Sequence, residues 1–175
     1  MEKSYKQYLS QINTLIFDVD GVLTNGIVTV FPNGELIRQM NIKDGYALRT
    51  AVNAGLRICI ITGGKHEGVK IRLENLGIKD VYMGAHNKIE QYNEFIDMYN
   101  LQPNNILYMG DDLPDYPIMK LVGLACCPND AAIEIQQISK YISDKKGGEG
   151  CVRDIIEQVL RVQGKWDSNF DATYD

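Results

Sequence analysis

The chain has 175 residues, 45% of them hydrophobic, and a formal net charge of -5 at pH 7. This length and apolar content suffice for one domain with its own core, so we expect a single domain over 1–175, with its core at about 10–163 and a polar tail at 164–175. No block of lysine and arginine occurs, which argues against nucleic acid or an anionic membrane as the partner. No run of about 18 apolar residues occurs either, and we therefore expect a cytoplasmic protein that acts on a small molecule.

Segments typical of buried strands alternate with helical segments along the chain. The strand-like segments are almost continuously apolar, as in strands covered on both faces, and they lie at 13–18, 56–61, 80–83, 105–109 and 122–126. Segments with helical periodicity follow them, at 45–54, 66–76, 87–100, 130–138 and 151–163. The alternation predicts an α/β fold, Rossmann-like, with helices flanking a mostly parallel sheet.

Residues 26–41 break this alternation. They contain two β-rich runs on either side of Pro32-Asn33-Gly34, a tripeptide typical of turns. We therefore predict a β-hairpin that projects as a flap between the first strand and the helix that follows it.

Polar residues cluster where the strand-like segments end, which is the edge at which open parallel sheets bind ligands. The set comprises Asp18, Asp20, Thr62, Gly63, Gly64, Lys88, Asp111, Asp112 and Asp115. Several carboxylates buried together are costly unless a cation joins them, and a donor set made only of oxygens favours Mg²⁺. We therefore predict a Mg²⁺ site, in preference to two acids that merely cap a turn.

A phosphate monoester suits this set of residues. Its negative charge repels an attacking carboxylate, so Mg²⁺ and Lys88 are needed as counter-charge. We predict that Asp18 attacks phosphorus to form an aspartyl-phosphate and that Asp20 acts first as general acid and then as general base. The supporting roles are phosphoryl binding by Thr62 and the amides of the Thr-Gly-Gly turn, metal ligation by Asp111, and retention of metal-bound water or of Lys88 by Asp112 and Asp115.

Four motifs in this order, DVDGVLT, ITGG, the lysine of AHNK and GDDLPD, resemble those of the haloacid dehalogenase superfamily. The resemblance implies phosphatase chemistry with Mg²⁺ and an aspartyl-phosphate. It also implies that Asp18 and Asp111 ligate the metal through their side chains and Asp20 through its main-chain carbonyl. Many members carry a cap domain, but here the gaps between motifs hold only the hairpin, two helices and a strand, so we expect none. Closure then has to come from another subunit, with the flap as the contact element.

The missing cap and the segment KKGGEGCVRD at 145–154 resemble the 3-deoxy-D-manno-octulosonate 8-phosphate (KDO-8-phosphate) phosphatase subfamily. The resemblance implies a homotetramer with active sites at subunit interfaces. It implies substrate contacts at Gly63 and Gly64, and an Arg72 that reaches a neighbouring site to bind the sugar-acid carboxylate, a group that arginine holds with two hydrogen bonds.

Three alternatives stay open. Phosphatases of nine-carbon sugar acids (KDN-9-phosphate or N-acylneuraminate 9-phosphate) typically have Glu at the position of Gly64 and Lys at that of Asn75, which favours the eight-carbon substrate here. Many octulosonate enzymes, however, have Arg at Gly64 and a basic residue at Glu149, so the sugar contacts remain open. A phosphorylated receiver does not explain an acid cluster that follows Lys88, and an idle oligomerisation module does not explain an intact acid set.

Overall fold

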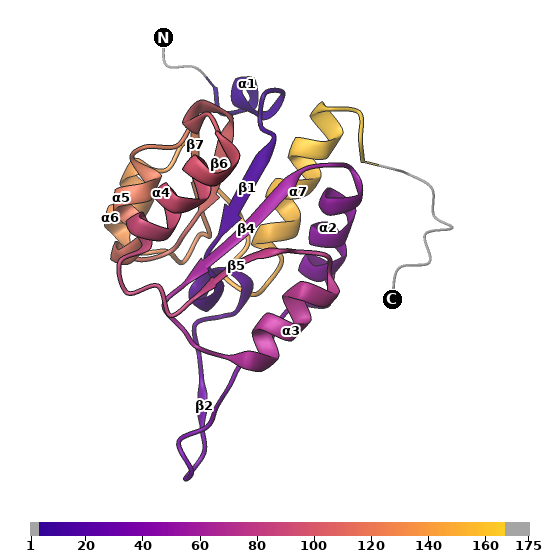
Figure 1. Ribbon diagram of the computed structural model, residues 1–175. Helices are drawn as coiled ribbons and strands as arrows, with labels where there is room; N and C mark the ends of the chain where they lie inside the picture. The colour runs from indigo at the N-terminus through magenta and orange to yellow at the C-terminus, as the bar shows by residue number, and fades with distance from the viewer. Residues whose placement is uncertain (1–3, 167–175) are drawn as a thin grey trace.

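The computed structural model describes residues 4–166, and its centre is a six-stranded sheet with the order β5-β4-β1-β6-β7-β8. Every neighbouring pair in this sheet is parallel, so the predicted α/β fold with a parallel sheet is confirmed (Figure 1). The strands are β1 (Thr14–Phe17), β4 (Arg57–Thr62), β5 (Asp80–Met83), β6 (Ile106–Met109), β7 (Leu124–Cys127) and β8 (Tyr141–Ile142).

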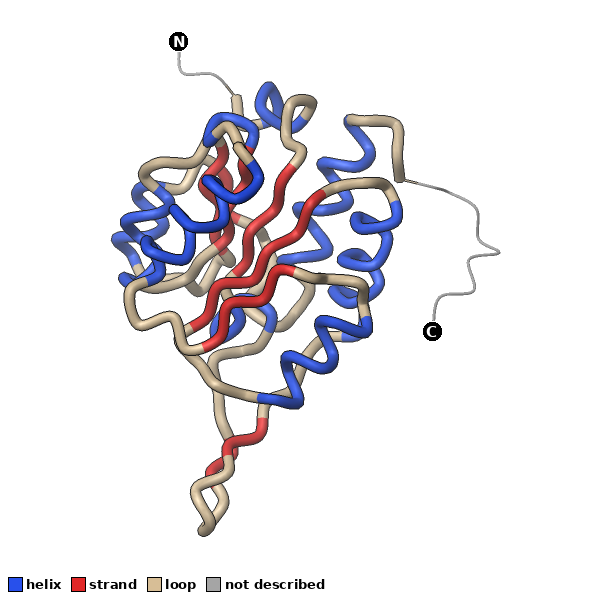
Figure 2. Tube along the Cα trace, viewed as in Figure 1, coloured by secondary structure: helices blue, strands red, loops and turns tan. Residues whose placement is uncertain are grey.

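Helices cover both faces of the sheet (Figures 1 and 2). On one face lie α2 (Ile42–Asn53), α3 (Glu67–Asn75) and α7 (Cys151–Val162). On the other face lie α4 (Lys88–Tyr99), α5 (Tyr116–Met119) and α6 (Ile133–Ile138). The remaining helical pieces are α1 (Lys6–Leu9), η1 (Val19–Leu23), η2 (Pro103–Asn105) and η3 (Leu113–Asp115). Within residues 4–166, no helix combines the length and the apolarity that crossing a bilayer requires.

The two faces of the sheet bury separate apolar clusters. Leu15 and Phe17 of β1 belong to one cluster and Ile16 to the other, because successive side chains of a strand point to opposite faces. Helix α7 buries an apolar stripe with helical spacing, formed by Val152, Ile155, Ile156, Val159 and Leu160. Full burial of one such side chain stabilises the fold by about 1.5–3 kcal/mol, so α7 is a main anchor of its face.

The predicted hairpin is present and projects from one end of the molecule (Figure 1). It consists of β2 (Thr29–Val30) and β3 (Leu36–Ile37), which pair antiparallel. Gly34 closes the turn with a φ of 83° and donates its N–H to the carbonyl of Phe31 at 2.8 Å. Ile27 and Val30 are 69% and 67% exposed. The flap therefore presents apolar side chains to solvent, and within residues 4–166 no cap domain lies over the adjoining strand ends.

Several boundaries differ from those predicted. Helix α2 begins at Ile42, three residues early, because the side chain of Asn41 accepts the N–H of Lys43 as a cap. Helix α6 begins only at Ile133, since Asp130 instead accepts the N–H of Gly147. Strand β8 and helix α5 were not predicted. They have two and four residues, too few to show a periodic pattern.

The predicted tail at 164–175 lies mostly outside the described residues, which end at Trp166. Its described part packs against the fold. The N–H groups of Lys165 and Trp166 donate to the carbonyl of Leu160, and the Trp166 ring meets that of Tyr46 edge-on at 6.3 Å. Trp166 is therefore an anchor for the end of α7.

Candidate active site

The site lies where the central strand β1 ends, between the ends of β4 and β6. Phe17, the last residue of β1, is opposite Ile60 of β4 and Met109 of β6. The N–H of Asp18 then donates to the carbonyl of Met109 at 3.1 Å. The sheet order therefore brings Asp18 beside Asp111, which follows β6.

The turn after β1 leaves room for the side chain of Asp111. Gly21 has a φ of 84°, a conformation that costs other residues strain. A Cβ at Gly21 would also collide with the carboxylate of Asp111. The hydroxyl of Thr24 fixes the turn, because it lies 3.3 Å from the carbonyl of Val19 and 3.2 Å from the N–H of Gly26. Glycine is thus required at position 21 for two independent reasons.

The glycine-rich segment at 145–150 supports this turn from behind. Gly148 donates its N–H to the carbonyl of Val22 at 2.9 Å. A Cβ at Gly147 would collide with the main-chain carbonyl of Gly21. Two backbones approach this closely only where a side chain is absent, so the segment before α7 is part of the framework of the site.

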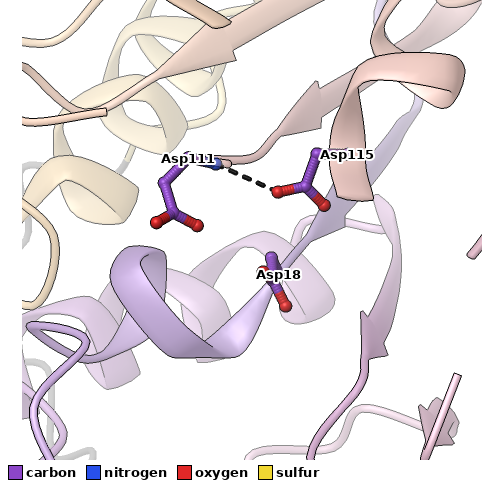
Figure 3. A group of neighbouring side chains, drawn as sticks. All are labelled: Asp18, Asp111 and Asp115. Carbon is purple, nitrogen blue, oxygen red and sulfur yellow. Dashed lines mark hydrogen bonds between the residues drawn. The ribbon is translucent and has the colours of Figure 1, made fainter. Parts of the chain in front are cut away.

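Three aspartates meet at the strand ends (Figure 3). Asp18, Asp111 and Asp115 each offer a carboxylate oxygen within 4.8 Å of the others. Lys88, the first residue of α4, lies between two of them, with its Nζ 2.7 Å from Asp18 and 2.6 Å from Asp115. The Lys88 side chain is only 5% exposed, so its ammonium group is held as a buried counter-charge.

Asp115 is fully buried and anchors the other groups. One of its oxygens accepts from Lys88 and from the hydroxyl of Tyr108, both at 2.6 Å. The other accepts the N–H groups of Asp111 and Asp112 at 3.1 and 3.4 Å. Asp112 itself caps η3 by accepting the N–H of Leu113. Asp115, and not Asp112, is therefore the carboxylate that holds Lys88 on this side.

The acids have the electrostatic character of a cation-binding site. Burial, followed by the neighbouring charges of Asp18 and Asp115, raises the pKa of Asp111 to about 8. Burial and Asp115 likewise raise the pKa of Asp18. Burial lowers the pKa of Lys88, but the two carboxylates outweigh it and hold that pKa above its usual value. Clustered acids whose charged forms are disfavoured in this way are stabilised by a bound cation.

The donor set fits a hard divalent cation. Oδ1 of Asp111 is buried and has no hydrogen-bond partner among the described residues, although a buried carboxylate oxygen normally has one. Asp111 and Asp18 each offer a carboxylate oxygen within 4.8 Å of the other, and oxygens are the ligands that Mg²⁺ prefers. Asp18 and Asp111 are thus the side chains that would hold the ion. Both carboxylate oxygens of Asp20 bind Arg38, so Asp20 would contribute to the ion through its main-chain carbonyl.

These groups line a cavity of about 460 Å³, which we call the acidic cavity. Thr62, Gly63 and Gly64 form its wall on the β4 side, and the Thr62 hydroxyl accepts the N–H of Gly64 at 3.2 Å. His86, which the sequence did not single out as a site residue, also lines it. The site residues from all four strand ends therefore share one space.

Arg38, at the base of the flap, was not predicted as a site residue. Its guanidinium binds the carboxylate of Asp20 with two bonds, at 2.6 and 3.0 Å. A third nitrogen lies 3.3 Å from Nδ1 of His66, whose pKa is lowered by burial and then by Arg38. The only signal in the sequence is an isolated basic residue at the end of an apolar β-rich run, which is too weak to identify its partner.

Arg72 does not line the acidic cavity. It lines a second cavity of about 640 Å³ between the hairpin and α3, which we call the flap cavity and which Arg38, Lys65 and His66 also line. Its guanidinium lies against Gly45 of α2, where a Cβ would stand 2.8 Å from it. Within one chain, the structure does not bring Arg72 together with the acids.

The comparison with known families first defines the class. Residues 78–155 match the family model of haloacid dehalogenase-like hydrolases, a range that includes Lys88, Asp111 and Asp115. The 3-deoxy-D-manno-octulosonate 8-phosphate phosphatase of Salmonella typhi is 38% identical over 156 residues, which cover 89% of this chain and 83% of the relative. The chain therefore belongs to the family of 3-deoxy-D-manno-octulosonate 8-phosphate phosphatases, within the haloacid dehalogenase-like hydrolases.

Solved structures agree with this assignment. The crystal structure of the Yersinia pestis 3-deoxy-D-manno-octulosonate 8-phosphate phosphatase superposes with a TM-score of 0.90 at 33% identity, covering 94% of this chain and 89% of that one. The enzyme of Moraxella catarrhalis, solved in complex with a magnesium ion, a phosphate ion and KDO, superposes with a TM-score of 0.89 at 28% identity, covering 93% and 94%.

Proposed function

We propose that the protein is a Mg²⁺-dependent phosphatase that hydrolyses 3-deoxy-D-manno-octulosonate 8-phosphate to KDO and phosphate. The observation that carries the proposal is the placement of Asp18. Asp18 is 7% exposed, and its carboxylate is paired with Lys88 at 2.7 Å and lines a cavity at the end of the central strand. The similarity to phosphatases of this substrate over 89% of the chain supports the choice of sugar.

In the first step, an oxygen of Asp18 attacks phosphorus and the bond from phosphorus to the sugar oxygen breaks. Asp20 gives its proton to that leaving oxygen. Lys88 offsets the negative charge of the nucleophile, and Thr62 donates a hydrogen bond to the phosphoryl group. A bound Mg²⁺, held by Asp18, Asp111 and the main chain of Asp20, supplies further positive charge at the phosphoryl oxygens.

In the second step, Asp20 takes a proton from a water molecule, which attacks the phosphorus of the aspartyl-phosphate. The bond to Asp18 breaks, phosphate leaves, and the carboxylate of Asp18 is restored. Asp115 has no direct part in either step. It keeps Lys88 and the backbone of Asp111 in place, as its contacts at 2.6 and 3.1 Å indicate.

The competing substrate is a nine-carbon sugar acid phosphate. Position 64 bears on this choice, because a Cβ there would stand 2.8 Å from the ring of His66 and 3.5 Å from Asp20. In this chain the His66 ring occupies the space that a side chain at position 64 would need. His66 therefore stands where related enzymes carry the side chain of Glu or Arg. Comparing kcat/KM for the eight-carbon and nine-carbon substrates tests the proposal. A preference for the nine-carbon substrate contradicts it.

We further propose a homotetramer that works in the cytoplasm. The exposed apolar side chains of the flap, among them Ile27 and Val30, and the separation of Arg72 from its own acidic cavity support subunit contacts. Four free, buried cysteines suit a reducing compartment. Light scattering coupled to size-exclusion chromatography tests the assembly, and a Val30→Asp variant is expected to dissociate it. A monomeric wild-type protein with full activity contradicts the tetramer.

A further inference from the structure

Arg38 differs from the rest of the flap in its burial. Its side chain is 6% exposed, whereas Val30 and Ile37 of the paired strands are 67% and 45% exposed. Burying a guanidinium is costly unless charge and hydrogen bonds compensate. Here the two bonds to the carboxylate of Asp20 provide that compensation.

The pair of Arg38 and Asp20 lies on the boundary between the two cavities. Asp20 lines the acidic cavity, whereas Arg38 and His66 line the flap cavity. Arg38 does not line the acidic cavity, so it is not placed to bind the phosphoryl group directly. Its direct partner in the reaction machinery is the carboxylate of Asp20.

Two parallel bonds restrict a carboxylate far more than one does, because the guanidinium fork fixes its plane as well as its position. The side chain of Asp20 is 37% exposed and would otherwise be free to rotate. Because Arg38 directly follows β3, any shift of the hairpin moves this fork and the carboxylate with it.

We propose that Arg38 is a positioning residue for Asp20: it fixes the carboxylate that exchanges a proton with the leaving oxygen, and it couples that proton transfer to the position of the flap. The inference rests on the proposed role of Asp20 as acid and base. It assigns the flap a part in the chemical step, beyond contact between subunits.

Loss of Arg38 should affect substrates according to the basicity of their leaving groups. Expulsion of a weakly basic leaving group needs little help from a general acid, whereas expulsion of a strongly basic one needs much. The test measures kcat/KM with saturating Mg²⁺ for aryl phosphates of graded leaving-group pKa, such as 4-nitrophenyl and phenyl phosphate. None of these substrates carries a carboxylate or a sugar, so contacts with those groups do not affect the measured kcat/KM. The ratio kcat/KM reports the steps up to departure of the leaving group.

Arg38→Ala is expected to lose less than about threefold on 4-nitrophenyl phosphate and more than about tenfold on phenyl phosphate. Asp20→Asn should show the same trend more steeply. In the double variant, removing Arg38 should cause no further loss, because it acts through a carboxylate that is already gone. Arg38→Lys, which keeps the charge but not the fork, should fall between wild type and Arg38→Ala.

Gln39→Ala, a change at the exposed neighbouring position, serves as the control and should match wild type throughout. The inference is overturned if Arg38→Ala lowers kcat/KM equally across the series, or if the losses add in the double variant. Either result would mean that Arg38 only stabilises the flap. A wild-type protein that turns over neither aryl phosphate nor sugar phosphate overturns the proposed function itself, a result distinct from the first.

Discussion

The acidic cavity is assembled from strand ends, and the flap cavity next to it is assembled from a hairpin and one helix. At the acidic cavity, the buried Lys88 is ion-paired with both Asp18 and Asp115, which are buried as well. The flap cavity is lined by the cations Arg38, Lys65 and Arg72 and bordered by exposed apolar side chains. We expect two tasks to follow from this difference: the acidic cavity binds the phosphoryl group, and Arg72 of the flap cavity binds the rest of the substrate in a neighbouring subunit.

The largest expected effect on activity comes from replacing the nucleophile of the acidic cavity. Asp18→Asn should reduce kcat by at least about 10³-fold, since loss of a nucleophile removes the covalent route. Turnover of 4-nitrophenyl phosphate measures this, and circular dichroism checks the fold. Asp144→Asn alters an acid whose side chain is 76% exposed and should leave turnover unchanged. Retained activity in Asp18→Asn would exclude the assignment.

The next effect removes the buried cation. Lys88→Met should lower kcat/KM by about 10²–10³-fold, the usual effect of deleting one preorganised charged donor. It also leaves Asp18 and Asp115 without the ammonium group between them, so the melting temperature should fall. The loss should be similar for sugar and aryl phosphates, because the contact is with the phosphoryl side. A loss confined to the sugar phosphate would contradict a role of Lys88 at the phosphoryl group.

The corresponding change in the flap cavity should discriminate between substrates. Arg72→Ala is expected to lower kcat/KM for the sugar-acid phosphate about 10–100-fold, equivalent to one charged hydrogen-bonded contact, and to spare 4-nitrophenyl phosphate. Arg49→Ala is the matched control, since Arg49 lies on α2 and bonds the carbonyl of Asn75. Equal losses on both substrates would contradict a role in sugar binding.

The smallest effect concerns stability and pH. Because the folded pKa of Asp111 is about 8, against an ordinary value of 3.8, the metal-free protein should lose stability as pH rises between these values. Mg²⁺ should offset that loss, so it should raise the melting temperature by a few degrees more at pH 8 than at pH 5. Asp111→Asn should abolish most of the difference. A Mg²⁺ effect independent of pH would argue against a site built on these acids.

Sequence reasoning located the acidic cavity better than the flap cavity, for a physical reason. The carboxyl ends of parallel strands meet at one edge, so the segments that carry Asp18, Thr62 and Asp111 converge once the fold class is known. The bond from Tyr108 to Asp115 was missed because Tyr108 lies within a continuously apolar strand, where nothing distinguishes it from a core residue. The contact of Arg38 with Asp20 depends on how the hairpin folds back, which short-range patterns do not encode.

The close approach of Gly147 to Gly21 has a consequence for the order in which the enzyme is made. The turn that carries the nucleophile leaves the ribosome early, but the backbone that supports it lies more than 120 residues later in the chain. A nascent chain therefore has to be almost complete before Gly147 and Gly148 can pack against this turn. Premature termination between Asp115 and Gly147 should yield fragments that carry every catalytic side chain and still do no chemistry.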